Sequence, residues 1–98
     1  MKTIHWSKQS VDDLEAIHSF IARDSETYAL RVIKSLIDAV EQIAAFPGSG
    51  RPIPERPETD LRELIRPPYR IIYRAAANQV EIVTVFHSSR SLELDGPP

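Results

Sequence analysis

Four arginines and one histidine in the C-terminal half of the chain are the residue types best suited to chemistry. They are Arg51, Arg62, Arg70, His87 and Arg90. A guanidinium is a rigid, permanently charged fork that matches phosphate oxygens, and an imidazole can transfer a proton near neutral pH. Such groups together could stabilise a phosphate-centred transition state. The chemistry they indicate is metal-independent cleavage of RNA, in which a 2′-hydroxyl attacks its own phosphate.

The same residues also have a purely structural interpretation. The arginines can form ion pairs with the acids at 55, 58, 63 and 81, and His87 can close the edge of a sheet. Clusters of ionisable groups are structural more often than catalytic, so spacing alone favours ion pairing. Both interpretations stay open on the residues alone.

Other kinds of site find little support in the sequence. His5, His18 and His87 are scattered and the chain has no cysteine, so neither a metal ion nor another cofactor is expected. The glycine-containing stretch 48–51 lacks the lysine and hydroxyl residue of a phosphate-binding loop, which favours a turn. The serines at 88–89 follow the histidine directly, but neighbouring residues of a strand face opposite ways and no nucleophile elbow is present.

Positive charge is concentrated on arginines toward the C-terminal end. The 98-residue chain carries a net charge of −2, whereas a protein that grips many phosphates normally has a basic excess. Residues 61–90 nevertheless hold five arginines against two acids. In the stretch YRIIYR at 69–74, alternation places Arg70 and Arg74 on one side of a strand. These two arginines either coat a solvated face or point toward an anionic partner.

The first half of the chain predicts a strand followed by a helical hairpin. Residues 2–6 alternate and include β-formers, which indicates a short first strand. Ser7 or Ser10 can cap the amphipathic helix that follows. A second cap at 24–26 begins a longer helix, which is expected to end near Phe46 because a Pro-Gly stop signal comes next. Two helices joined by so few residues should pair antiparallel.

The second half predicts three strands after an irregular, proline-rich connector at 47–60. Asn78 is the residue expected to have a positive φ in the last hairpin turn, and the tail 93–98 is expected to fray. The strands are expected at 61–65, 69–75 and 80–86, the last of them central, with turns at 67–68 and 77–79.

The expected fold class is α+β, with the order β-α-α-β-β-β in a single domain, 1–98. The helical hairpin should pack on one face of a small antiparallel sheet. No helix remains for the other face, which is therefore expected to be open. Arg70 and Arg74, or else the tyrosines beside them, would meet a partner there.

Four segments, taken in order, resemble the ParE/RelE toxin superfamily. They read FPGSGR at 46–51, LREL at 61–64, PYRIIYR at 68–74 and IVTVFHSSR at 82–90. The first helix, with its DLE at 13–15, also looks like ParE. The resemblance covers essentially the whole chain. It implies a toxin of a bacterial type II toxin–antitoxin operon with the same β-α-α-β-β-β fold.

The superfamily has two branches. RelE-like members cut mRNA in the ribosome, and ParE-like members poison DNA gyrase. Arg70 matches the arginine of the RelE-like strand, so the resemblance makes Arg70, His87 and Arg90 the catalytic candidates if the chain is a ribonuclease. RelE-like enzymes tend to be basic, with lysines on the sheet face and a tyrosine near the C-terminus. This chain has a pI near 5.9, no lysine after Lys34 and no tyrosine after Tyr73.

The turn at Arg51 and the ending His87-x-x-Arg90 look more like ParE. The resemblance therefore implies a gyrase-binding toxin that needs no catalytic residue, with the strand end from 87 to Leu94 helping to set the contact. A degenerate toxin that only binds its antitoxin is a third possibility. The residues expected to bind the target are Arg51, Arg62, Arg70, Arg74, His87 and Arg90.

The resemblance also implies partners. A cognate ParD-like antitoxin is expected to wrap the toxin with its C-terminal segment, which would fold on binding, and DNA gyrase is the expected target. Strong direct binding of nucleic acid by the toxin alone is not expected, since no basic recognition helix is present. No membrane span or signal peptide is apparent, so no membrane partner is expected and the expected location is cytoplasmic.

Overall fold

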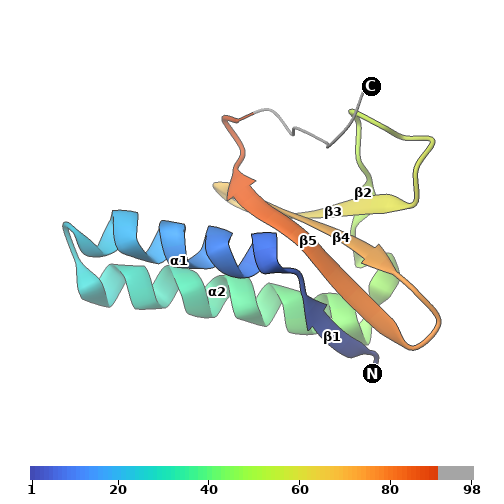
Figure 1. Cartoon of the computed structure of the whole chain (residues 1–98), viewed down its shortest axis with the longest axis horizontal. Helices are drawn as coiled ribbons and strands as arrows, with labels where there is room; N and C mark the ends of the chain where they lie inside the picture. The colour runs from blue at the N-terminus through green and yellow to red at the C-terminus, as the bar shows by residue number, and fades with distance from the viewer. Residues whose placement is uncertain (91–98) are drawn as a thin grey trace.

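The computed structural model describes residues 1–90 of the chain, so the predicted fraying of 93–98 and the expected role of Leu94 lie outside the described residues. Two helices lie against one sheet, and the helical hairpin projects beyond the strands (Figure 1). The elements are β1 (Thr3–Trp6), α1 (Lys8–Ala22), α2 (Glu26–Ala45), the 3-10 turn η1 (Pro47–Ser49), β2 (Arg51–Pro52), β3 (Leu61–Arg66), β4 (Tyr69–Ala75) and β5 (Gln79–His87).

Serine side chains begin both helices, as the sequence predicts. Ser7 is the cap of α1, and its Oγ accepts a hydrogen bond from the Ser10 backbone N–H at 3.0 Å. Ser25 caps α2 in the same way, accepting from the N–H of Tyr28 at 3.1 Å. Each cap satisfies a backbone donor that the first helical turn leaves free. The predicted end of the second helix near Phe46 is also confirmed.

The strands within residues 1–90 form one sheet in the order β1-β5-β4-β3-β2. The expected α+β class is confirmed, but the sheet is mixed because β1 runs parallel to β5. The expectation of an antiparallel sheet does not hold for β1, because no hairpin turn links β1 to β5. The middle strand is β4, whereas β5, expected to be central, is an interior strand beside it.

The main core lies between the helices and the sheet side that they cover, which we call the helix face. Its buried members include Leu36 and Ile43 of α2 and Ile71, Tyr73 and Ile82 of the sheet. These residues come from the apolar stripe of α2 and from alternate positions of the strands, as periodicity predicts. The other side of the sheet is called the second face here.

The second face is not open along its whole length. Ile53 of the connector is fully buried and packs with Leu61, Ile72 and Phe86 in a smaller cluster. Part of the connector is also the short strand β2, which pairs with β3. The expectation of an irregular connector and an uncovered face is therefore wrong in this region, because a single isoleucine anchors the connector to the sheet.

The turn between β4 and β5 differs from its prediction. No non-glycine residue in the described range has a positive φ, so the expectation for Asn78 is wrong. The connection has three residues, 76–78, and the Ala76 N–H donates to the Gln79 carbonyl at 2.8 Å. The loop therefore closes without the left-handed residue that the common two- and three-residue hairpin turns use. The turn expected at 67–68 is present between β3 and β4.

Candidate functional site

Arg70 of β4 lies in the centre of an ionic network on the second face, in which Arg70 and Glu63 are buried. Its Nε donates to Glu63 Oε1 at 2.7 Å, and its two terminal nitrogens donate to the two carboxylate oxygens of Glu55 at 2.7 and 2.9 Å. The guanidinium also lies over the ring of Phe86, 5.1 Å from the ring centroid. Hydrogen bonding to Glu55, followed by Glu63, raises the pKa of Arg70. The arginine fork is thus filled by carboxylates of the same chain.

Glu63 connects this network to the connector. Its side chain is completely buried, and its Oε2 accepts a hydrogen bond from Arg51 Nε at 2.6 Å. A buried carboxylate is tolerated only when it is paired and hydrogen-bonded. Arg51 and Arg70 supply this pairing from opposite sides. The four side chains of Arg51, Glu55, Glu63 and Arg70 carry no net charge together.

Arg74 lies on the same face, nearer to solvent. Its Nε is 2.9 Å from Asp60 Oδ1, and its Nη1 is 3.3 Å from Glu81 Oε1. The hydrogen bond to Asp60 is the first cause that raises the pKa of Arg74. The pairs of Arg70 with the acids at 55 and 63 and of Arg74 with Glu81 match the structural interpretation of the sequence, whereas Asp60 was not among the acids expected.

Arg62 and Arg66 of β3 point the other way. In the register they lie opposite Tyr73 and Tyr69, which pack on the helix-side core. Cross-strand partners share a face of the sheet, so both arginines lie on the helix face. One terminal nitrogen of Arg62 donates to the Gly50 carbonyl at 2.5 Å. Within residues 1–90, neither arginine has a carboxylate at ion-pair distance.

His87, the last residue of β5, also lies on the helix face. It is opposite Tyr69 in the register, and the two rings meet edge to face with centroids 5.7 Å apart. The backbone N–H of Ser89 donates to His87 Nδ1 at 3.1 Å. Arg90 follows with an exposed side chain, and its N–H donates to the His87 carbonyl.

The sheet therefore separates the residues that the sequence grouped together. Arg70 is opposite Phe86 in the register, whereas the next pair along, Tyr69 and His87, faces the helices. Consecutive strand residues point to opposite faces, so Arg70 and His87 are not in one site. No sequence signal indicated Glu55 as a ligand of Arg70, because the pairing depends on how the connector folds back.

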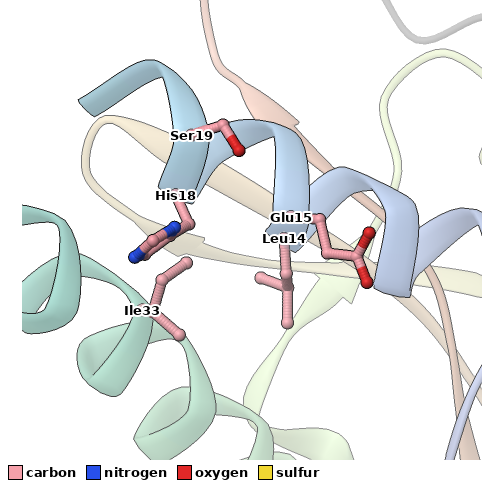
Figure 2. Close-up of a pocket in the computed structure, with 5 residues that line it drawn as sticks. All are labelled: Leu14, Glu15, His18, Ser19 and Ile33. Atoms are coloured by element: carbon pink, nitrogen blue, oxygen red, sulfur yellow. The ribbon is translucent and has the colours of Figure 1, made fainter. Parts of the chain in front are cut away.

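A shallow hollow of about 350 Å³ lies on the helical hairpin. Figure 2 shows Leu14 of α1 and Ile33 of α2 on facing sides of it, with Glu15, His18 and Ser19 along α1. The Nε2 of His18 is 3.0 Å from Glu26 Oε1, so this histidine already has a partner. Both apolar residues belong to the stripes that sequence periodicity assigns to the core, which is why sequence reasoning did not single out a hollow.

Two further observations concern metal ligands and helix length in the described chain. No cluster of three or more histidine, aspartate or glutamate side chains in residues 1–90 is arranged to hold a metal ion. Neither helix there combines the length and apolar character needed to cross a membrane.

Comparison with known proteins identifies the family of this chain. The family described as "ParE toxin of type II toxin-antitoxin system, parDE" matches residues 4–92. Toxin Y4kP of Sinorhizobium fredii is 36% identical over 89 residues, which cover 89% of this chain and 88% of the relative. Toxin RelE2 of Caulobacter vibrioides is 34% identical over 91 residues, which cover 92% and 99% of the two chains.

A solved structure shows the same fold. The chain described as the chromosomal ParDE toxin–antitoxin system from P. aeruginosa superposes with a TM-score of 0.70 at 22% identity, over 89% of this chain and 96% of that one. The match to the family spans nearly all of the described elements, from β1 through β5. The chain therefore belongs to the ParE toxin family and is a toxin of the type II toxin–antitoxin class.

Proposed function

We propose that this toxin acts by binding and poisoning DNA gyrase, and not by cutting RNA. The observation that carries the proposal is the state of Arg70, whose donors are taken by Glu55 and Glu63. A ribonuclease would need this guanidinium free to bind the charge that develops on a phosphate.

Electrostatics supports the same proposal. A phosphate that approaches Arg70 must displace Glu55 and then lie beside Glu63, which is fully buried and negatively charged. Like charges so close together repel strongly where water is excluded. Histidine-assisted proton transfer finds no support either, since His87 lies across the sheet from Arg70 and a proton donor or acceptor must be within hydrogen-bond reach.

The side chains proposed to contact gyrase are those that the fold leaves accessible. Arg51, Arg74, His87 and Arg90 are exposed, whereas Arg70 is buried. Arginine is enriched among the residues that dominate protein interfaces. Arg70 is instead proposed to hold the connector in place, and Arg62 is considered separately below.

The proposed second partner is a ParD-like antitoxin. The solved relative that shares this fold is described as a toxin–antitoxin system. On the hairpin, Leu30 and Ile37 of α2 are 56% and 39% exposed and flank Ile33 of the hollow at helical spacing. Exposed apolar side chains grouped around a depression suit an amphipathic segment that folds on binding. A cytoplasmic location follows from the proposed target.

A RelE-like ribonuclease remains the second candidate, because Toxin RelE2 of C. vibrioides matches nearly its whole length to this chain. In that case Arg70, His87 and Arg90 would be the catalytic residues, and Glu55 would have to move away. Purified toxin added to a translating lysate, followed by primer extension on mRNA, tests this candidate. Specific new 5′ ends in the lysate would support it.

Gyrase itself provides the direct test. Toxin, gyrase, ATP and plasmid DNA are combined, and supercoiling and DNA cleavage are followed with and without antitoxin. The proposal requires loss of supercoiling and trapped linear DNA, both reversed by the antitoxin. A toxin that binds antitoxin yet leaves both gyrase and mRNA unaffected would instead be the degenerate form.

A further inference from the structure

Arg62 and Arg66 differ from every arginine of β2 and β4. The arginines of those two strands all pair with carboxylates on the second face. In the part of the chain that the structure describes, Arg62 and Arg66 have no such partner, although the β3 segment between them contains a glutamate. That glutamate, Glu63, points to the second face, where it binds Arg51 and Arg70. Alternation along β3 has thus separated these two positive charges from the available acids.

Each of the two side chains also contains a buried donor that has no acceptor in the described part of the chain. The Nε atoms of Arg62 and Arg66 are shielded from solvent and have no hydrogen-bond partner among residues 1–90. Buried donors in native structures are nearly always satisfied, so each exception requires an explanation. A partner that supplies carboxylate oxygens would accept hydrogen bonds from these Nε donors and would also neutralise the two positive charges.

The two arginines lie in a row with Leu64, on the same face and half-buried like them. Residues four apart on a strand are separated by roughly 13 Å, the span of a short extended segment. The neighbouring strand β2 begins at Arg51, opposite Glu63, and runs from there toward the start of β3. The Ile53 N–H donates to the Leu61 carbonyl, so positions 61, 63 and 65 direct their backbone groups to this edge. Among residues 1–90, β2 pairs only with Arg62 and Glu63, so the backbone at Ile65 has no strand partner on this edge and could receive an added segment.

We propose that the row of Arg62, Leu64 and Arg66 receives an acidic segment of the antitoxin, with carboxylates on the two arginines and an apolar residue on Leu64. This inference rests on the proposed function, since it assumes a neutralising antitoxin. The occupant is the antitoxin and not gyrase, because a chain that folds on binding can extend along a strand and its free edge. Neutralisation would then include contacts between carboxylates and arginines, in addition to apolar contacts at the hollow on the hairpin.

The test compares binding of three toxin variants to the purified antitoxin of the same operon by calorimetry at low and high salt. Arg62→Gln and Arg66→Gln each remove one charge from the row. Arg23→Gln is the matched control, because Arg23 also lacks a carboxylate partner in the described chain and its guanidinium lies over the ring of Phe20. Arg62→Gln and Arg66→Gln should each weaken binding about tenfold or more and reduce its salt dependence, since charge-assisted contacts are lost. Arg23→Gln should leave affinity unchanged.

Four results would overturn the inference. Wild-type affinity in Arg66→Gln means that the row is not occupied, and an equal loss in Arg23→Gln means that only overall charge matters. Lost gyrase inhibition with intact antitoxin binding would assign the row to the target. A wild-type toxin that binds no antitoxin would overturn the proposed antitoxin partner as well. Arg62 supports the turn at Gly50, so if Arg62→Gln fails to fold, the result for Arg66→Gln decides alone.

Discussion

Replacement of Arg70 by alanine should strongly lower the free energy of unfolding of the toxin, because Arg70 is buried and ion-paired. The variant leaves Glu63, whose side chain is 0% exposed, with Arg51 as its remaining cationic partner. Removing one member of a buried ion pair costs about 3–5 kcal/mol in the free energy of unfolding. We expect a value near the lower limit, about 3 kcal/mol, because Arg51 stays in place. For a domain of this size, that loss lowers Tm by roughly 15 °C.

The assay is urea unfolding followed by the fluorescence of Trp6, the one tryptophan of the chain, with circular dichroism as a second probe. The control is the double variant Arg70→Met with Glu63→Leu, which removes both charges and keeps the volume. It should lie within about 1.5 kcal/mol of wild type, or be more stable. A cost below about 1 kcal/mol for Arg70→Ala would refute the reasoning that the network holds the connector on the sheet.

Three further predictions concern other parts of the fold. Gly50→Ala should lower the free energy of unfolding by about 1–3 kcal/mol, because an added Cβ would lie 2.6 Å from Tyr73 Oη. Nothing lies within 4 Å of a Cβ added at Gly48. Gly48→Ala should therefore be neutral in the same urea unfolding experiment. Arg74→Gln should change the free energy of unfolding by less than about 1 kcal/mol. It should nevertheless reduce growth arrest when the toxin is induced without antitoxin. Full growth arrest would count against Arg74 as a target contact. Burial, with a smaller effect of Tyr28, raises the pKa of Tyr69 above its usual value of 10.0. Its contribution to stability should therefore be complete below that pH and be lost as the pH rises through the folded-state value. Denaturation and tyrosinate absorbance across this range, with Tyr69→Phe as control, would measure the loss, and identical pH profiles would contradict it.

The sequence predicts much of this fold because the local signals agree with one another. The serine caps at 7 and 25, the stop after Phe46 and the alternation through 69–74 each indicate the element that forms. The parallel pairing of β1 with β5 could not be predicted in this way, since it joins segments with more than seventy residues between them. Pairings of that kind are decided by packing of the whole chain.

The sequence predicts which residue types are candidates for the site, but it does not predict which of them lie together in the structure. Alternation correctly places Arg70 and Arg74 on one side of β4, and the same rule applied to β3 and β5 places Arg62 and His87 on the other. What the sequence does not contain is the position of Glu55, because a proline-rich connector has no periodicity from which its direction can be derived. Glu55, together with the buried Glu63, determines whether Arg70 is free to bind an anion.

The most direct test of the central claim is the gyrase assay with purified wild-type toxin. Supercoiling of plasmid DNA and the amount of linear, cleaved DNA are measured as toxin concentration rises, and antitoxin is then added. The account predicts loss of supercoiling with accumulation of cleaved DNA, both reversed by antitoxin. Unaffected gyrase at high toxin excess, together with cleaved mRNA in a translating lysate, would contradict it and return Arg70 to the role of a catalytic residue.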